Sequence, residues 1–132
     1  MSTVVDDTRA AIEGRIATNW ADDRIRWPNV AYTPTEGKTW LAVDIRWGDG
    51  FIATKNGRNR LIGVLFLTVY SPVGRGDGAI SELADDARDL VNRLEVSGVR
   101  FVAPSGPNFS TDAATKWRQA QVTCGFSIEE EV

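Results

Sequence analysis

The chain has 132 residues, of which 42% are hydrophobic and 25% charged, and its 18 acidic and 15 basic side chains give a net charge of −3. This size and composition fit one globular domain, and no apolar run reaches the roughly 20 residues of a membrane-spanning helix. Histidine is absent and cysteine occurs once, which excludes histidine-based nucleophilic catalysis, histidine-containing zinc sites and an intramolecular disulfide.

The first expected element is a helix over residues 8–19. Asp6 and Asp7 precede it, and acidic residues at that position favour a helix start. Ile12 and Ile16 lie four residues apart and give the helix one modest apolar face. The helix therefore depends on packing against the rest of the chain.

Residues 21–38 contain proline, asparagine and glycine breakers, yet they also carry aromatic and aliphatic side chains. Two interpretations stay open for this arm. It covers one edge or end of a sheet, or it is a surface for another subunit, since tryptophan, tyrosine and arginine are enriched at protein interfaces. Trp20, Trp27 and Tyr32 are the candidates for such a contact.

The next segment predicts an antiparallel meander. Residues 40–47 alternate as a half-buried strand, with one face made of Leu41, Val43, Ile45 and Trp47 and the other of Trp40, Ala42, Asp44 and Arg46. Residues 48–50 are expected to form a turn and 51–55 a short strand. Asn56-Gly57 is a strong hairpin signal leading to a strand from Arg60. The apolar run 60–70 is typical of a strand buried on both faces in the middle of a sheet.

The hairpin tip at residues 55–60 is the densest basic cluster of the chain and includes Arg58 and Arg60. Two interpretations remain for it. It is a solvated turn that protects the end of a strand, or it contacts an acidic neighbour, either an adjacent copy of the chain or a nucleic-acid backbone.

A glycine-rich loop at 71–78 separates this strand from a helix over 79–94. Residues 74–79 match the G-x-G-x-x-A form of a dinucleotide-binding loop. A dinucleotide site also needs successive βαβ units, whereas the chain after this helix offers only strands. We expect the glycines to serve the turn, and a small nucleotide- or phosphate-binding domain stays the distant alternative. Arg75 and Asp77 are charged candidates for partner contacts on this loop.

The last third of the chain predicts a short strand at 99–103, a loop at 104–115 without a core-forming pattern, and an alternating strand at 117–128. The expected fold is thus one α+β domain over 1–132, with a mixed, mostly antiparallel sheet of about five strands and two helices packed on it. Residues 1–5 and 129–132 are expected to be loosely ordered.

No catalytic, metal-binding or cofactor-binding constellation is expected, so the sequence predicts a protein that is not an enzyme. Asp85, Asp86 and Asp89 fit the solvated face of a helix, and Cys124 fits a buried, inert thiol. The chain is also mildly acidic, so it lacks the excess of basic residues that is typical of a protein that binds nucleic acid.

Several stretches together resemble a family of small tailed-phage and prophage proteins, the phage tail terminators, which are similar to those of lambda-like phages. The resemblance rests on residues 19–20, 25–32, 57–60, 69–72 and 74–78, and it spans about residues 8–128. None of these stretches is a catalytic signature.

The resemblance implies a structural tail protein that forms a homo-oligomeric ring, a hexamer, on the end of the tail tube. Such a ring would contact the tail tube protein on one side and the head connector protein on the other, while DNA passes through without specific binding. It implies a place in the tail of the virion after assembly in the host cytoplasm, and no membrane. Another head-tail connector or a minor tail protein of similar fold is the alternative.

Overall fold

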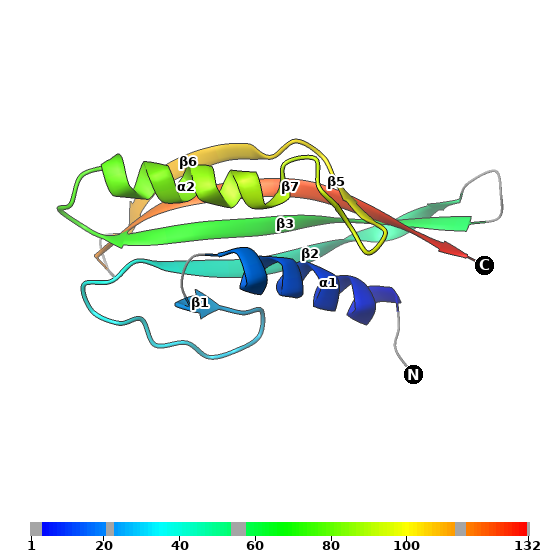
Figure 1. The fold of residues 1–132 in the computed structure, drawn as a ribbon, viewed down its shortest axis with the longest axis horizontal. Coiled ribbons are helices and arrows are strands. Elements are labelled where there is room, and N and C mark those ends of the chain that lie inside the picture. The colour runs from blue at the N-terminus through cyan, green and yellow to red at the C-terminus, as the bar shows by residue number, and fades with distance from the viewer. Residues whose placement is uncertain (1–3, 21–22, 54–57, 113–115, 132) are drawn as a thin grey trace.

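Two helices lie on one face of a seven-stranded sheet in the computed structural model, which describes residues 4–20, 23–53, 58–112 and 116–131 (Figure 1). The elements in chain order are α1 (Val4–Asn19), β1 (Ile25–Arg26), β2 (Trp40–Ala53), β3 (Arg58–Pro72), α2 (Gly78–Val91), β4 (Glu95–Val96), β5 (Val99–Phe101), β6 (Ser105–Asp112) and β7 (Trp117–Glu131). The molecule is elongated along β2, β3 and β7, which extend past α2 (Figure 1).

The strands follow the order β1-β2-β3-β7-β5-β4, and β6 pairs with β7 as well. Only the β1–β2 pairing is parallel among the pairings of the described strands. The α+β class, the mostly antiparallel sheet and the two helices are confirmed, whereas the predicted number of about five strands is too small. The prediction missed the two-residue strands β1 and β4, which are too short to show a periodicity, and β6.

The expected turn at residues 48–50 is wrong, since β2 continues through it to Ala53. Its pairing with β3 shifts register between Trp47 and Phe51. The extra residues are therefore accommodated as a β-bulge, which bends a strand and increases its twist without ending it. The expected hairpin tip at residues 54–57 lies outside the described residues.

The expected loop at 104–115 is also wrong over most of its length, because β6 pairs with the outer edge of β7 from Ser105↔Thr123 to Asp112↔Trp117. This strand is rich in serine, threonine and asparagine. Such a composition is compatible with an edge strand, because backbone hydrogen bonds to β7 hold β6 in place and it needs no buried side-chain face. Pro107 lies in the irregular stretch between Ser105 and Asn108, where its missing N–H is tolerated.

Both helix boundaries differ from the expectation. Since α1 begins at Val4, Asp6 and Asp7 lie inside its first turn, where acidic side chains favour the helix dipole. Since α2 ends at Val91, residues 95–98 do not form its exit but a hairpin between β4 and β5, in which Ser97 and Gly98 both have positive φ. Regular structure thus includes parts of both termini, from Val4 and up to Glu131.

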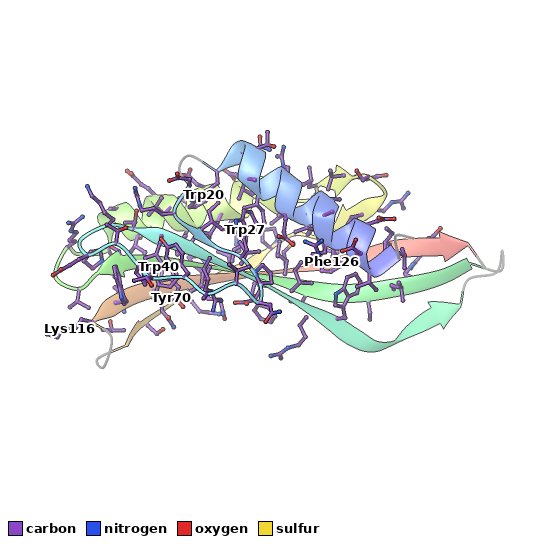
Figure 2. All side chains as sticks on the ribbon, turned by 90° about the horizontal axis from the view of Figure 1, so that it is seen from below. Trp20, Trp27, Trp40, Tyr70, Lys116 and Phe126 are labelled. Atoms are coloured by element: carbon purple, nitrogen blue, oxygen red, sulfur yellow. The ribbon has the colours of Figure 1, made fainter. Side chains whose placement is uncertain are left out.

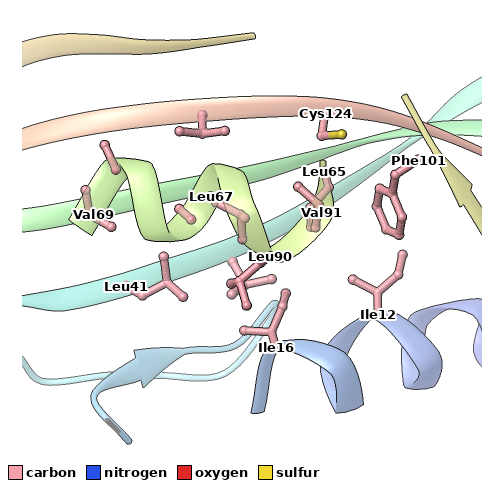
Figure 3. Packing of buried hydrophobic residues seen from close by; sticks show 14 of the residues in the cluster. Ile12, Ile16, Leu41, Leu65, Leu67, Val69, Leu90, Val91, Phe101 and Cys124 are labelled. Atoms are coloured by element: carbon pink, nitrogen blue, oxygen red, sulfur yellow. The ribbon is translucent and has the colours of Figure 1, made fainter. Parts of the chain in front are cut away.

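The core lies between the helices and the inner face of the sheet (Figure 3). From α2 it takes five fully or almost fully buried residues, Ile80, Ala84, Ala87, Leu90 and Val91, and from α1 it takes Ile12 and Ile16. The sheet contributes alternate residues of three paired strands, such as the row Val43, Leu67 and Val122. The period-two and period-3.6 patterns therefore meet in one cluster.

The helices cover only this inner face, and that corrects the expectation for the strand at 60–70. β3 does lie in the middle of the sheet, between β2 and β7. On its outer face, however, Ile62 remains 41% exposed and Phe66 is half-buried. The prediction that β3 is buried on both faces is wrong because no helix covers the second face.

Candidate functional site

The outer face of the sheet is the face on which neither α1 nor α2 packs. It carries the residues of β2, β3 and β7 that alternate with the core residues, as the cross-strand rows Trp40–Tyr70–Gln119, Asp44–Phe66–Thr123 and Arg46–Val64–Gly125 show. Its side chains form three zones, which differ in chemistry from one end of the sheet to the other.

An aromatic cluster covers one end of the outer face. Trp40 and Tyr70 stack with ring centroids 4.0 Å apart and planes 5° apart, and Trp117 meets Trp40 edge-on at 6.0 Å. Tyr32 of the arm lies 5.2 Å from Trp40 on the same cluster. Figure 2 shows Trp40 and Tyr70 side by side. The arm after β1 therefore covers this end of the sheet.

The centre of the outer face carries apolar side chains, the Asp44 carboxylate and the Arg46 cation. The Arg46 guanidinium lies 5.5 Å from the centroid of the Phe66 ring, a cation–π contact. Among the described residues Arg46 has no salt-bridge partner, whereas neighbouring Arg26 pairs with Asp44. Val64 and Ile62 continue the apolar surface beside Arg46. We call these four residues, Arg46, Ile62, Val64 and Phe66, the Arg46 patch.

Two exposed ion pairs occupy the far end of the outer face. Arg60 of β3 lies 3.2 Å from Glu129 of β7, and Arg100 of β5 lies 3.6 Å from Glu95 of β4. They border a shallow concavity of about 420 Å³. Exposed pairs of this kind add little to stability, so the described side chains at this end form an exposed rim in which the charges are balanced.

A groove of about 400 Å³ lies on the opposite side of the molecule, between α1 and α2. Trp20, Leu83 and Leu90 give it an apolar floor, and the exposed Asp86 and Asp89 stand on its rim. Arg15 and Asn19 also line it, and Arg15 donates from Nε to the Leu90 carbonyl oxygen over 3.2 Å. We call this feature, with its seven lining residues, the helix groove.

The glycine loop before α2 is held by charged side chains. Arg75 donates to the Gly37 carbonyl oxygen over 2.8 Å, and Asp77 accepts two hydrogen bonds of 3.0 Å from Arg118 of β7. These bonds lower the pKa of Asp77 below its usual value. Gly74 and Gly76 have positive φ, as a chain reversal requires.

This loop lacks the surroundings of a nucleotide site. The neighbours of β3 in the sheet are the antiparallel strands β2 and β7, whereas a dinucleotide loop joins parallel strands. The Asp77 carboxylate also stands at the amino end of α2, where it would repel a phosphate. The geometry does not favour the nucleotide-binding alternative.

The other chemistry-bearing groups offer no reactive centre in the described part of the chain. Burial raises the pKa of the Cys124 thiol from 9.0 to about 11, so this thiol stays protonated and unreactive. No group of three histidine, cysteine, aspartate or glutamate side chains there could hold a metal ion. None of its helices is long and apolar enough to cross a membrane.

The structure spreads the predicted contact residues over several places. Trp20 lies in the helix groove, Trp27 packs half-buried against the core, and Tyr32 joins the aromatic cluster. Arg60 belongs to the far rim of the outer face, and the side chain of Arg58 lies outside the described residues. Arg75 and Asp77 both hold the loop before α2.

Sequence reasoning missed the Arg46 patch. The alternation of residues 40–47 did assign Arg46 to the face away from the core, together with a tryptophan. A large aromatic residue on the polar side of a strand is a signal that this side also packs or binds. The patch as a whole could not be read from this strand alone, because Ile62, Val64 and Phe66 come from β3 and meet Arg46 only through the register of the two strands.

Comparisons with known proteins place this arrangement in one family. The family model described as phage tail terminator protein matches residues 7–105. No curated protein matches the sequence.

Two solved structures share the fold over almost their whole length. One, which bears only a sequence identifier as its name, has a TM-score of 0.72 at 19% identity and covers 96% of both chains. The other belongs to the virion of a native gene transfer agent particle and has a TM-score of 0.64 at 14% identity, covering 97% of this chain and 99% of that chain. At these identities the likeness shows the fold alone. With the family model matching most of the sequence, we conclude that this chain belongs to the phage tail terminator family and is a structural protein of a phage tail.

Proposed function

We propose that this chain is the tail terminator of its virion and acts without enzymatic activity, as a homo-oligomeric ring that caps the tail tube and joins it to the head connector. The match of the terminator family model to residues 7–105 is the observation that carries the proposal. The ring is taken to be a hexamer, as the resemblance implies, and to let DNA pass through its hole without specific binding.

The shape and chemistry of the subunit support a ring. A cyclic ring needs a heterologous contact, in which one surface of a subunit meets a different surface of the next. This subunit has unlike surfaces on its two sides: an outer sheet face with an arginine and a helical side with carboxylates, none of which has a salt-bridge partner among the described residues. The arm also packs onto its own sheet through Ile25 and Tyr32, so the contact surfaces are held on a rigid support.

Tail tube polymerisation tests the proposal. Purified tail tube protein of the same phage is polymerised with and without this chain, and tube lengths are measured by negative-stain electron microscopy. The proposal predicts shorter tubes of narrower length distribution, with a ring of extra density at one end. Tubes whose length and ends do not respond to the chain would contradict it.

The same experiment separates the terminator from another head-tail connector or minor tail protein of similar fold. A connector that joins the head without stopping the tube would bind purified connector protein but leave the tube length unchanged. A chain of the gene transfer agent virion shares this fold. This likeness favours a role in the virion under either alternative.

A further inference from the structure

The helix groove is lined by two carboxylates, Asp86 and Asp89, and one guanidinium, Arg15. Arg15 donates to the Leu90 carbonyl oxygen and makes no salt bridge with either aspartate within the described chain, so the lining keeps a net negative charge. Four exposed carboxylates project from α2, those of Glu82, Asp85, Asp86 and Asp89. None of them has a salt-bridge partner among the described residues. Asp86 and Asp89 stand above the apolar floor of Trp20, Leu83 and Leu90. Such a groove suits a cation whose own stem or neighbours are apolar.

The Arg46 patch has the complementary chemistry. Four arginine side chains are described on the outer sheet face. Arg26, Arg60 and Arg100 are each paired with a carboxylate, and Arg46 has no salt-bridge partner within the described chain. Its guanidinium lies 5.5 Å from the centroid of the Phe66 ring, and Val64 and Ile62 line a hollow on one side of Arg46. Asp44 lines the hollow on the other side, but its carboxylate already pairs with Arg26. The patch therefore presents one cation with an apolar flank.

We propose that the Arg46 patch of one subunit docks on the helix groove of the next copy of this chain, with Arg46 between Asp86 and Asp89 and against the Trp20 ring. The proposal rests on the ring of the proposed function and names the contact that builds it. A second copy is the occupant because both halves of the complementary pair belong to one chain.

The placement of the two surfaces agrees with a contact that repeats around a ring. The Arg46 patch lies on the outer face of the sheet, and the helix groove lies beyond the inner face, on the far side of the helices. A subunit can therefore use both surfaces at once, each toward a different neighbour. Pairing of like surfaces would bring Asp86 and Asp89 against the same carboxylates of the partner, which like-charge repulsion opposes.

Charge-reversal variants test the contact in the full chain. Arg46→Glu and Asp86→Arg change exposed side chains, and far-UV circular dichroism and thermal unfolding check that each variant folds. Both variants are expected to associate at least about tenfold more weakly than the parent chain in analytical ultracentrifugation. Arg46→Lys, which keeps the positive charge, is expected to weaken association less than Arg46→Glu does.

Two matched controls make the same charge changes elsewhere. Lys116→Glu reverses an exposed cation just before β7, at the aromatic end of the sheet, and Asp7→Arg reverses an exposed carboxylate on α1. Figure 2 shows Lys116 at the end of the strands, away from α1. Both controls are expected to associate like the parent chain, so a general effect of net charge is separated from the docking contact.

Mixing the two variants gives the sharpest result. In an alternating assembly, the intact groove of Arg46→Glu meets the intact patch of Asp86→Arg, and the reversed patch meets the reversed groove. Every contact again joins opposite charges, so the mixture is expected to regain larger assemblies that neither variant forms alone. A mixture that stays as small as its components would overturn the proposal, and so would single variants that assemble like the parent.

The outcome for this contact is independent of the outcome for the function. A parent chain that limits tube length while Arg46→Glu and Asp86→Arg assemble normally would leave the terminator role standing and remove this contact. A parent chain that assembles through this contact without affecting tube length would leave the contact standing and remove the terminator role.

Discussion

Gly63 shows at the scale of one residue how tightly the long strands meet the inner core. A Cβ atom at this position would lie 2.5 Å from Cζ of Phe126 and 3.0 Å from the Arg46 carbonyl oxygen. The Phe126 ring cannot move aside easily, because it is 3% exposed and contacts Trp47 and Phe101. Overpacking of this kind costs about 1–3 kcal/mol. We therefore expect Gly63→Ala to lower the free energy of unfolding by that amount in urea titrations.

Gly125 is the matched control, since it lies in the neighbouring strand β7 but faces outward. A Cβ atom there would meet Cγ2 of Val102 at 3.5 Å, an ordinary contact. Gly125→Ala is expected to leave stability unchanged or to raise it by about 0.4–1 kcal/mol through the unfolded state. Equal losses for both variants would mean that any side chain weakens these strands, and the Phe126 contact would not be the cause.

The burial of a residue could be predicted from the sequence where its own side-chain type and the local pattern determine that burial. Cys124 was expected to be a buried, inert thiol, and it is 2% exposed with a raised pKa. Gly63 could not be predicted in this way, because its close neighbour Phe126 is brought against it only by the register of β3 and β7. Long-range register is not written in local composition.

The link between Asp77 and Arg118 acts at the scale of elements, since it ties the start of α2 to β7. Asp77 occupies the N-cap position of α2 but makes no capping hydrogen bond with its side chain. Its carboxylate instead accepts two hydrogen bonds from Arg118. The ordinary role of an N-cap aspartate is thus replaced by a contact that fixes the helix against the sheet.

Stability should therefore depend on the ionisation of Asp77. In the folded state, the Arg118 guanidinium lowers the pKa of Asp77 below its ordinary value of 3.8. A carboxyl with a lowered folded pKa stabilises the fold above its unfolded pKa and loses that contribution as the pH falls through its folded pKa. Asp77→Asn should be less stable than the parent near neutral pH, and the difference should shrink below a pH of 3.8.

Thermal unfolding of both chains across this range measures the difference. Asp7→Asn is the control, because this exposed aspartate of α1 has no salt bridge in the described chain. A parent chain and an Asp77→Asn variant that differ equally at neutral and acidic pH would show that the hydrogen bonds of Asp77 matter and its charge does not.

Elements could be predicted where a local period was strong. The apolar stripe of α2 and the alternation of β7 both appeared with nearly the right bounds, because each pattern repeats over several turns or residues. β6 was missed because its stability comes from backbone hydrogen bonds to β7, which no side-chain pattern of Ser105–Asp112 records. The bulge in β2 was mistaken for a turn because glycine favours both.

At the scale of the whole molecule, the candidate site depends on which sheet face the helices cover. The sequence predicted two helices packed on a sheet, and it did not fix that both lie on one face. The Arg46 patch and the helix groove follow from that arrangement, since one is what the helices leave open and the other is formed between them. Trp20 was predicted as a contact residue from composition alone, and it lines the groove.

The strand order also predicts how opening motions are distributed over the molecule. β3 is paired on both sides, by β2 and by β7, along nearly its whole length from Arg58 to Pro72. β1 and β4 have two residues each, and they lie at the two edges of the sheet. Because amides at edges open without breaking the core, exchange there reports small local openings, whereas exchange in β3 requires global unfolding.

We therefore expect hydrogen–deuterium exchange, followed by mass spectrometry of peptic fragments, to be slowest in β3 and fastest at β1, β4 and the arm. The free energy of opening in β3 should equal that of global unfolding measured by denaturant, and Gly63→Ala should lower both together. Fragments of β3 that exchange as fast as those of β1 would contradict the central position of this strand. The expected gradient bears on the proposed contact, because a rigid β3 would hold the Arg46 patch at a fixed distance from the helix groove, as a contact that repeats around a ring requires.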